Sequence, residues 1–192
     1  MSADVGTTTK LLGLSGSIRQ ESFNTAVLLS LAERLRGGAN LIVHPLNEVP
    51  PYNQDCDEDL TPAAVRELRI AVGAADGLIL CSPEYNYGMS GVLKNAIDWI
   101  SRPAMKSTLK GKPVLIMSCS PSATGGARAH AQMREALCAC LARVVVRPQV
   151  VIAYVKEKIQ GGRVIDQATL ALLAEAVNDL LQEITVATTI PR

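Results

Sequence analysis

The chain has 192 residues, a formal net charge of +1, 48% hydrophobic residues and only 3% aromatic residues. Near neutrality argues against nucleic acid or an acidic membrane surface as a partner, and no run approaches the about 18 apolar residues of a membrane span. The length predicts one domain over residues 1–192, and the polar residues 1–9 predict a flexible tail without a signal peptide. Five cysteines without a CxxC pair predict reduced thiols in a cytoplasmic protein.

Short aliphatic runs alternate with helical patterns along the chain, which is typical of parallel strands joined by crossover helices. The predicted strands are residues 10–14, 40–44, 77–81, 113–117 and a segment within 144–151. The predicted helices are residues 24–36, a segment that starts at Thr61-Pro62, and residues 90–100, 127–141 and 167–185. This alternation predicts an α/β fold, namely the flavodoxin-like, doubly wound, five-stranded parallel sheet of order 2-1-3-4-5 with helices on both faces.

In such a sheet, ligands bind outside the carboxyl ends of the strands, where the strand order reverses. The loops that reach this edge are residues 13–24, 82–90 and 118–126, and they are the stretches richest in polar residues and glycine. We therefore expect the functional site there.

The first loop offers the side chains of Ser15, Ser17, Arg19, Ser22 and Asn24 immediately before a helix. Hydroxyl groups and the free N–H groups of a helix start together bind a phosphate group well. The simpler alternative is that these residues only cap the helix and fill a turn. A cap accounts for one Ser or Asn, but not for four such residues with an arginine.

The second and third loops have the properties of a site for a planar heterocycle. Pro83 stiffens the second loop, Tyr85 and Tyr87 offer flat surfaces, and Asn86 offers a donor and an acceptor. In the third loop, Gly125-Gly126 permits close approach of the backbone to a ligand. Ordinary turns remain the alternative for both loops.

Classical catalytic sets are missing from the sequence. His44 and His130 are the only histidines, neither has metal-ligand spacing, and no pair of carboxylates stands out. A serine hydrolase would need one of these histidines as a partner, and a response-regulator-like domain would need acidic residues where Ser15 and Ser17 stand. We expect no metal and no catalytic side chain, so a cofactor would carry the chemistry.

These loops resemble the family of NAD(P)H-dependent FMN reductases, which includes flavodoxin-like quinone and chromate reductases. The resemblance covers roughly residues 10–185 and is most specific over residues 83–99. It also rests on residues 16–19, 22–24 and 50–55, whereas residues 121–124 depart from the pattern.

The resemblance implies an enzyme that binds FMN at fourteen residues. The phosphate group would lie at Ser15, Ser17, Arg19, Ser22, Phe23 and Asn24; the ring would lie along Pro83, Glu84, Tyr85, Asn86 and Tyr87; and Ser118, Gly125 and Gly126 would approach from the other side.

The implied reaction is ping-pong hydride transfer from NADPH or NADH, through FMN, to a small acceptor such as a quinone, chromate, an azo compound or a flavin. The family also implies a homodimer or homotetramer. The alternative is a flavodoxin-like electron carrier that binds FMN without oxidising NAD(P)H directly.

Overall fold

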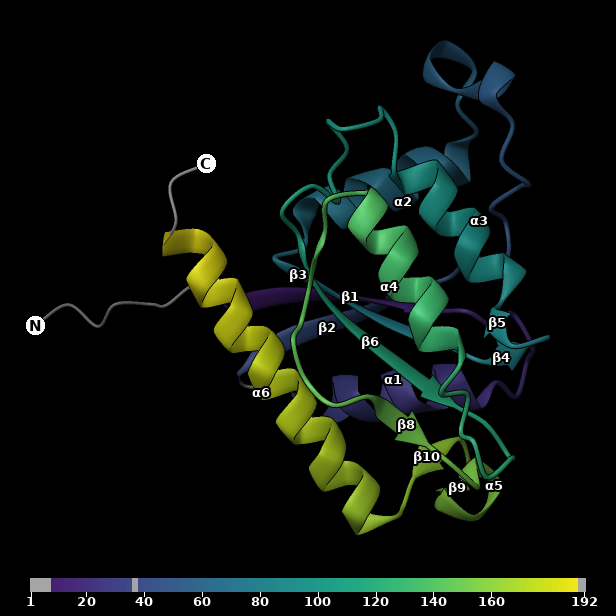
Figure 1. Cartoon of the computed structure of the whole chain (residues 1–192), viewed down its shortest axis with the longest axis vertical. Coiled ribbons are helices and arrows are strands. Elements are labelled where there is room, and N and C mark those ends of the chain that lie inside the picture. Colours follow the sequence, from purple (N-terminus) through teal and green to yellow (C-terminus); the bar gives the residue numbers. More distant parts are fainter. Residues whose placement is uncertain (1–7, 36–37, 190–192) are drawn as a thin grey trace, which may run out of the picture.

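A central, mostly parallel sheet organises the computed structural model of the chain, which describes residues 8–35 and 38–189 (Figure 1). Its order is β2-β1-β3-β6, and two short strands, β7 and β8, both pair with β6. These strands are β1 (Thr9–Ser15), β2 (Ala39–His44), β3 (Gly77–Ser82), β6 (Pro113–Cys119), β7 (Arg143–Val144) and β8 (Val150–Ile152). The predicted fold and strand order are confirmed.

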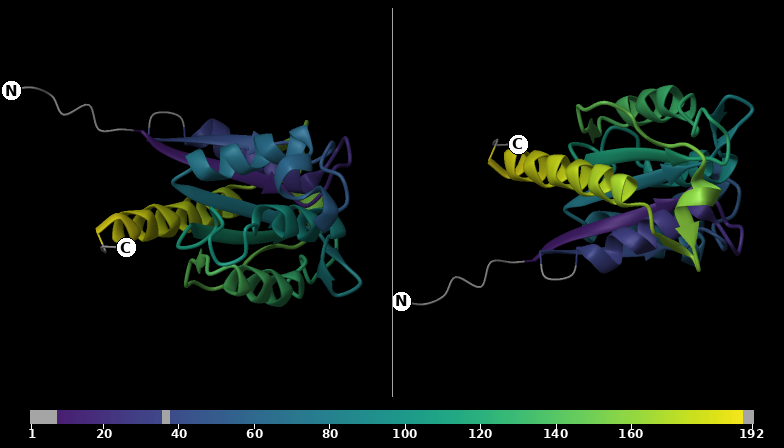
Figure 2. Two further views of the ribbon diagram at one scale, coloured as in Figure 1. Left: turned by 90° about the horizontal axis from the view of Figure 1, so that it is seen from above. Right: turned by 90° about the horizontal axis from the view of Figure 1, so that it is seen from below.

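Helices cover both faces of the sheet, as Figure 2 shows from opposite sides. One face carries α1 (Phe23–Arg34) and α6 (Gln167–Thr189), and the other carries α2 (Ala63–Ala74), α3 (Gly91–Ile100) and α4 (Ala129–Ala139). Every residue of β3 and β6 is buried between these layers. This double burial explains why their sequences are continuously apolar rather than alternating.

Helix boundaries differ from the predicted ones by a few residues. Of the predicted start Thr61-Pro62, Pro62 occupies the N-cap of α2, and the helix begins at Ala63. Helix α1 ends at Arg34, and the predicted last residue, Arg36, lies outside the described residues. Of the predicted tail, residues 1–7 also lie outside them, whereas Thr9 already belongs to β1.

The fifth strand is broken in two, which the sequence did not predict. Val144 is paired with Val114, and Val150 is paired with Met117. Five residues of the later segment therefore face only two residues of β6, so the chain bulges out between the two pairings. Pro148 lies in this bulge. Proline has no backbone N–H group to donate to a neighbouring strand, so it fits a segment that is not paired in the sheet.

Two short hairpins and three short helices complete the described fold. The hairpins pair β4 (Glu84–Tyr85) with β5 (Gly88–Met89) and β9 (Ile159–Gln160) with β10 (Arg163–Val164). The short helices are η1 (Gln54–Cys56), η2 (Glu58–Leu60) and α5 (Val155–Lys158). Within the described ranges, no helix is both long enough and apolar enough to cross a bilayer.

Candidate functional site

A pocket of about 260 Å³ lies at the carboxyl ends of β1, β3 and β6, where the three predicted loops meet. It is lined by Ser17, Arg19, Phe23, Asn24, Pro83, Glu84, Tyr85, Cys119, Ser120, Pro121 and Lys156. Seven of the fourteen predicted site residues are thus brought together. Cys119, Ser120, Pro121 and Lys156 were not predicted to belong to the site.

In the first loop, two of the serines serve the protein's own backbone. Ser22 is the N-cap of α1, since its Oγ accepts a hydrogen bond from the Thr25 N–H at 3.2 Å. Ser15 Oγ donates to the Ser17 carbonyl oxygen at 3.1 Å and accepts a 2.8 Å hydrogen bond from the Thr25 hydroxyl, and Ser15 lines a neighbouring pocket rather than this one. Ser17 and Arg19 face the pocket, and the Ser17 hydroxyl makes no hydrogen bond within residues 8–35 and 38–189. The capping alternative therefore holds for Ser22 but leaves Ser17 unexplained.

Asn24 presents an amide donor to the pocket. Its Oδ1 accepts a hydrogen bond from Cys81 Sγ at 3.3 Å, and the residue is only 4% exposed. A hydrogen bond with Cys119, together with burial, raises the pKa of the Cys81 thiol well above its usual value, so the thiol keeps its proton and acts as the donor. Among the described residues the Nδ2 group of Asn24 has no partner, and it is available to a ligand.

The second loop is the β4–β5 hairpin, and it is fastened to the start of α4. The Glu84 carboxylate accepts a 3.0 Å hydrogen bond from the Arg128 N–H and a 3.3 Å bond from the Arg128 guanidinium. That guanidinium lies 4.5 Å from the centre of the Tyr87 ring. Asn86 and Tyr87 form the turn with positive φ and lie outside the pocket lining, whereas Pro83, Glu84 and Tyr85 form part of it.

The third loop contributes different residues from those predicted. Ser118, Gly125 and Gly126 are buried behind the pocket, and a Cβ atom on Gly126 would lie 3.0 Å from the Ser118 Cβ. The pocket wall is formed instead by the next residues along the strand end, Cys119 to Pro121.

Ser118 and His130 form a hydrogen bond of 3.0 Å between Oγ and Nε2, which is the pairing a serine hydrolase would need. Both residues are 0% exposed, so no substrate reaches this hydroxyl.

We expect the His130 ring to make stability depend on pH. Burial, reinforced by Arg134, lowers the pKa of His130 to about 4, below the ordinary value of 6.5. The folded state therefore favours the neutral ring, and its stability should fall by roughly 3 kcal/mol as the pH drops from 6.5 to 4. In His130→Gln, urea unfolding should show a much smaller fall over this range, because Gln does not titrate.

His44→Gln is the matched control, since burial lowers the pKa of His44 as well but the Glu67 charge opposes the shift. The control should keep most of the wild-type pH dependence. An unchanged pH dependence in His130→Gln would contradict the assignment.

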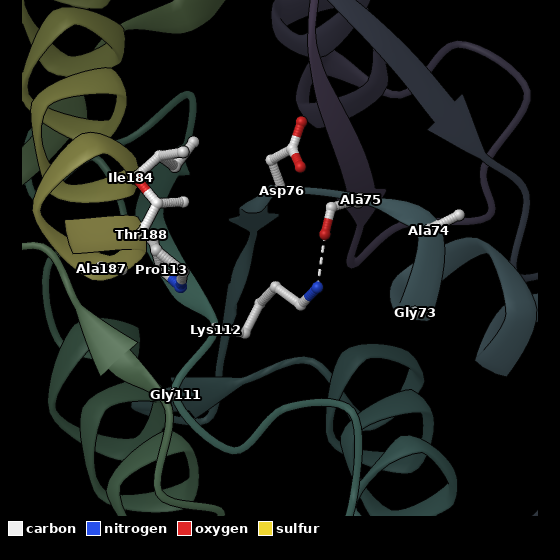
Figure 3. Close-up of a pocket in the computed structure, with 10 residues that line it drawn as sticks. All are labelled: Gly73, Ala74, Ala75, Asp76, Gly111, Lys112, Pro113, Ile184, Ala187 and Thr188. Carbon is white, nitrogen blue, oxygen red and sulfur yellow. Dashed lines mark hydrogen bonds between the residues drawn. The ribbon is translucent and has the colours of Figure 1, made fainter. Parts of the chain in front are cut away.

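A second pocket, of about 530 Å³, lies at the opposite edge of the sheet, beside the end of α6 (Figure 3). Its charged groups are engaged by the protein: Lys112 Nζ donates to the Ala75 carbonyl oxygen, and the Asp76 carboxylate accepts a 2.8 Å bond from the Lys10 N–H. Although this pocket is larger, doubly wound sheets bind ligands at the carboxyl ends of their strands. The pocket of Ser17 and Pro83 is therefore the candidate site.

A doubly wound sheet with a polar pocket at its switch point defines the class of nucleotide-binding and flavin-binding α/β proteins. The model of the NADPH-dependent FMN reductase family matches residues 9–157. An NAD(P)H-dependent FMN reductase of Pseudomonas aeruginosa is 36% identical over 172 residues, covering 89% of this chain and 92% of that protein. The chain belongs to the NADPH-dependent FMN reductase family.

The chain is also similar to two further proteins that are named as enzymes. A quinone reductase of Escherichia coli is 38% identical over 165 residues, covering 84% of this chain and 87% of that protein. The solved structure of FerB, a flavoenzyme NAD(P)H:(acceptor) oxidoreductase from Paracoccus denitrificans, superposes with a TM-score of 0.85 and 28% identity, covering 94% of this chain and 99% of that one. The chain is an oxidoreductase that uses FMN as cofactor and NAD(P)H as electron donor.

Proposed function

We propose that this protein holds FMN in the pocket between its three loops and reduces a quinone-like acceptor with NAD(P)H. The observation that carries the proposal is the convergence of Ser17, Arg19 and Asn24 with Pro83 and Tyr85 in one pocket at the switch point. A phosphate group and a planar ring need these two kinds of surface side by side.

The phosphate end fits a monoester dianion. The start of α1 supplies N–H groups and the positive end of a helix dipole, and Ser17, Arg19 and Asn24 add donors. FMN, when bound, supplies the hydride chemistry, so the chain needs neither a nucleophile nor a metal. Ser15 and Ser22 take part by fixing the shape of the loop, while Phe23 lines the pocket beside Arg19.

The ring end is a preorganised platform. Glu84 and Arg128 tie the hairpin to α4, so Pro83 and Tyr85 are held in place before a ligand arrives. Ser118 and His130 support the strand end from behind, and Gly125 and Gly126 allow the third loop to pack closely under it. Such fixed positions orient a donor and an acceptor at close approach and exclude water.

The acceptor is proposed to be a quinone, as in the named relative; chromate, azo compounds and free flavins are further candidates for the same pocket. We propose a homodimer or homotetramer in the cytoplasm. Tyr85 and Tyr87, 59% and 74% exposed beside the pocket, offer an apolar surface to a second copy.

The purified protein should be yellow, with the absorption bands of bound FMN. It should oxidise NAD(P)H in the presence of a quinone with parallel-line ping-pong kinetics, because both substrates would use one ring face in turn. A colourless protein that neither binds added FMN nor oxidises NAD(P)H would refute the proposal. Tight FMN binding without NAD(P)H oxidation would favour the flavodoxin-like electron carrier.

A further inference from the structure

Lys156 lines the same pocket as Ser17 and Arg19, although it belongs to α5 and follows the last strand of the sheet. Sequence patterns alone assign no role to it. Its place in the pocket follows from the topology, which brings β8 and the turn after it next to the third loop.

The backbone around Lys156 is firmly held. The Val155 side chain is 0% exposed, and the Val155 N–H donates to the Ser120 carbonyl oxygen at 3.2 Å. The Tyr154 N–H donates to the Ser122 carbonyl oxygen at 3.3 Å. The turn is thus attached to the third loop, which holds the backbone at Lys156 beside the pocket, while the Lys156 side chain itself is exposed.

The pocket has an excess of positive charge. Within the described part of the chain, Lys156 has neither an ion pair nor a hydrogen bond. Arg19 donates to the Glu21 carbonyl oxygen and lies 5.1 Å from the centre of the Phe23 ring, and neither contact neutralises its charge. Glu84 is the acidic residue of the lining, and its carboxylate is paired with Arg128.

A buried neutral donor faces the same space. Asn24 is 4% exposed, and its Nδ2 group has no partner among the described residues. The pocket therefore presents two cations, one hydroxyl and one amide, and each of these groups can donate a hydrogen bond. A fitting ligand group accepts hydrogen bonds only and carries more than one negative charge.

We propose that Lys156 and Arg19 act as a two-sided clamp on a phosphate monoester dianion. This rests on the proposed function, which assigns the 5′-phosphate of FMN to Arg19. The 2′-phosphate of NADPH is the alternative source of such a group, and the measurements distinguish the two. Lys156 is then a specificity residue, which separates FMN from riboflavin or NADPH from NADH. An ammonium hydrogen bond to a phosphate dianion is strong enough for a discrimination of about tenfold or more.

The test compares Lys156→Gln with Lys156→Arg, which keeps the charge, and with Lys158→Gln. Lys158 lies on the same turn but acts elsewhere: the pKa of Asp166 is lowered by hydrogen bonds from Thr169 and, to a smaller extent, by the Lys158 charge. Dissociation constants for FMN and riboflavin are measured by flavin fluorescence, and KM is measured for NADPH and NADH.

Lys156→Gln should weaken FMN binding at least about tenfold and leave riboflavin binding unchanged, if the clamp holds the FMN phosphate. If it holds the 2′-phosphate, FMN binding should persist and KM should rise for NADPH but not for NADH. Lys156→Arg and Lys158→Gln should resemble the wild type in both assays.

Unchanged FMN binding together with an unchanged ratio of NADPH to NADH KM values in Lys156→Gln would overturn the clamp while leaving the proposed function intact. An equal loss of FMN and riboflavin binding would also overturn it, because the effect would not depend on phosphate. A wild-type protein that binds neither FMN nor NADPH would overturn the proposed function and the clamp with it.

Discussion

Ser17→Asp should bind FMN at least about a thousandfold more weakly than the wild type, because it places a carboxylate where the phosphate dianion is expected. A like charge at contact distance near a protein surface costs about 4 kcal/mol per pair of unit charges, which corresponds to this factor. The fold should survive, because Ser17 is only partly buried and its hydroxyl makes no hydrogen bond among the described residues. Fluorescence titration of the apoprotein with FMN measures the effect.

Ser17→Asn is the matched control, since Asn has the size of Asp without its charge. It should lose far less affinity than Ser17→Asp. Riboflavin, which lacks the phosphate group, should bind Ser17→Asp almost as it binds the wild type. Equal FMN affinities for Ser17→Asp and Ser17→Asn would show that no phosphate lies beside this residue.

Gly125→Ala should destabilise the protein by about 4 kcal/mol, which combines backbone strain at positive φ with overpacking. Gly125 has a φ of +56°, and a Cβ atom there would lie 2.4 Å from Val151 Cγ1 and 2.8 Å from the backbone nitrogen of Ala153. Val151 belongs to β8, which is paired with β6, and Ala153 lies between that strand and Tyr154, whose N–H donates to the Ser122 carbonyl oxygen, so neither neighbour moves easily. The difference in free energy of unfolding is measured by urea denaturation.

Gly161→Ala separates the two contributions. Gly161 has the same φ of +56°, but nothing lies within 4 Å of its missing Cβ. It should cost only about 1 kcal/mol, the backbone part of the effect. If Gly125→Ala cost no more than Gly161→Ala, the close packing of the third loop against β8 would be refuted.

The arrangement of the sheet was predictable because each strand carries its own local signal. The runs at residues 77–81 and 113–117 are apolar without interruption, and the helices between them have regular apolar spacing. The break between β7 and β8 was not predictable in the same way, since a bulge depends on which residues of β6 the later segment pairs with. Pro148 was the signal that could have suggested it. Gly161-Gly162 likewise marked the β9–β10 hairpin, with both residues at positive φ.

The site was predictable where its residues lie within one loop and unpredictable where they depend on packing. The place of Ser17 and Pro83 in the site was predictable, because each lies in a loop that directly follows a predicted strand. Ser118 was predicted to face the ligand but turns toward His130, which only the packing of α4 against β6 reveals. Lys156 was missed because its loop carries no motif, and its contact with the site depends on the strand order.

The strand order also determines at which stage of synthesis the complete pocket can form. The pocket wall draws on residues from Ser17 to Lys156, and β1 gains its second neighbour only when β3 has been made. A nascent chain that has not yet reached Lys156 lacks one wall of the pocket. The complete pocket therefore forms only when nearly the whole sheet has been made.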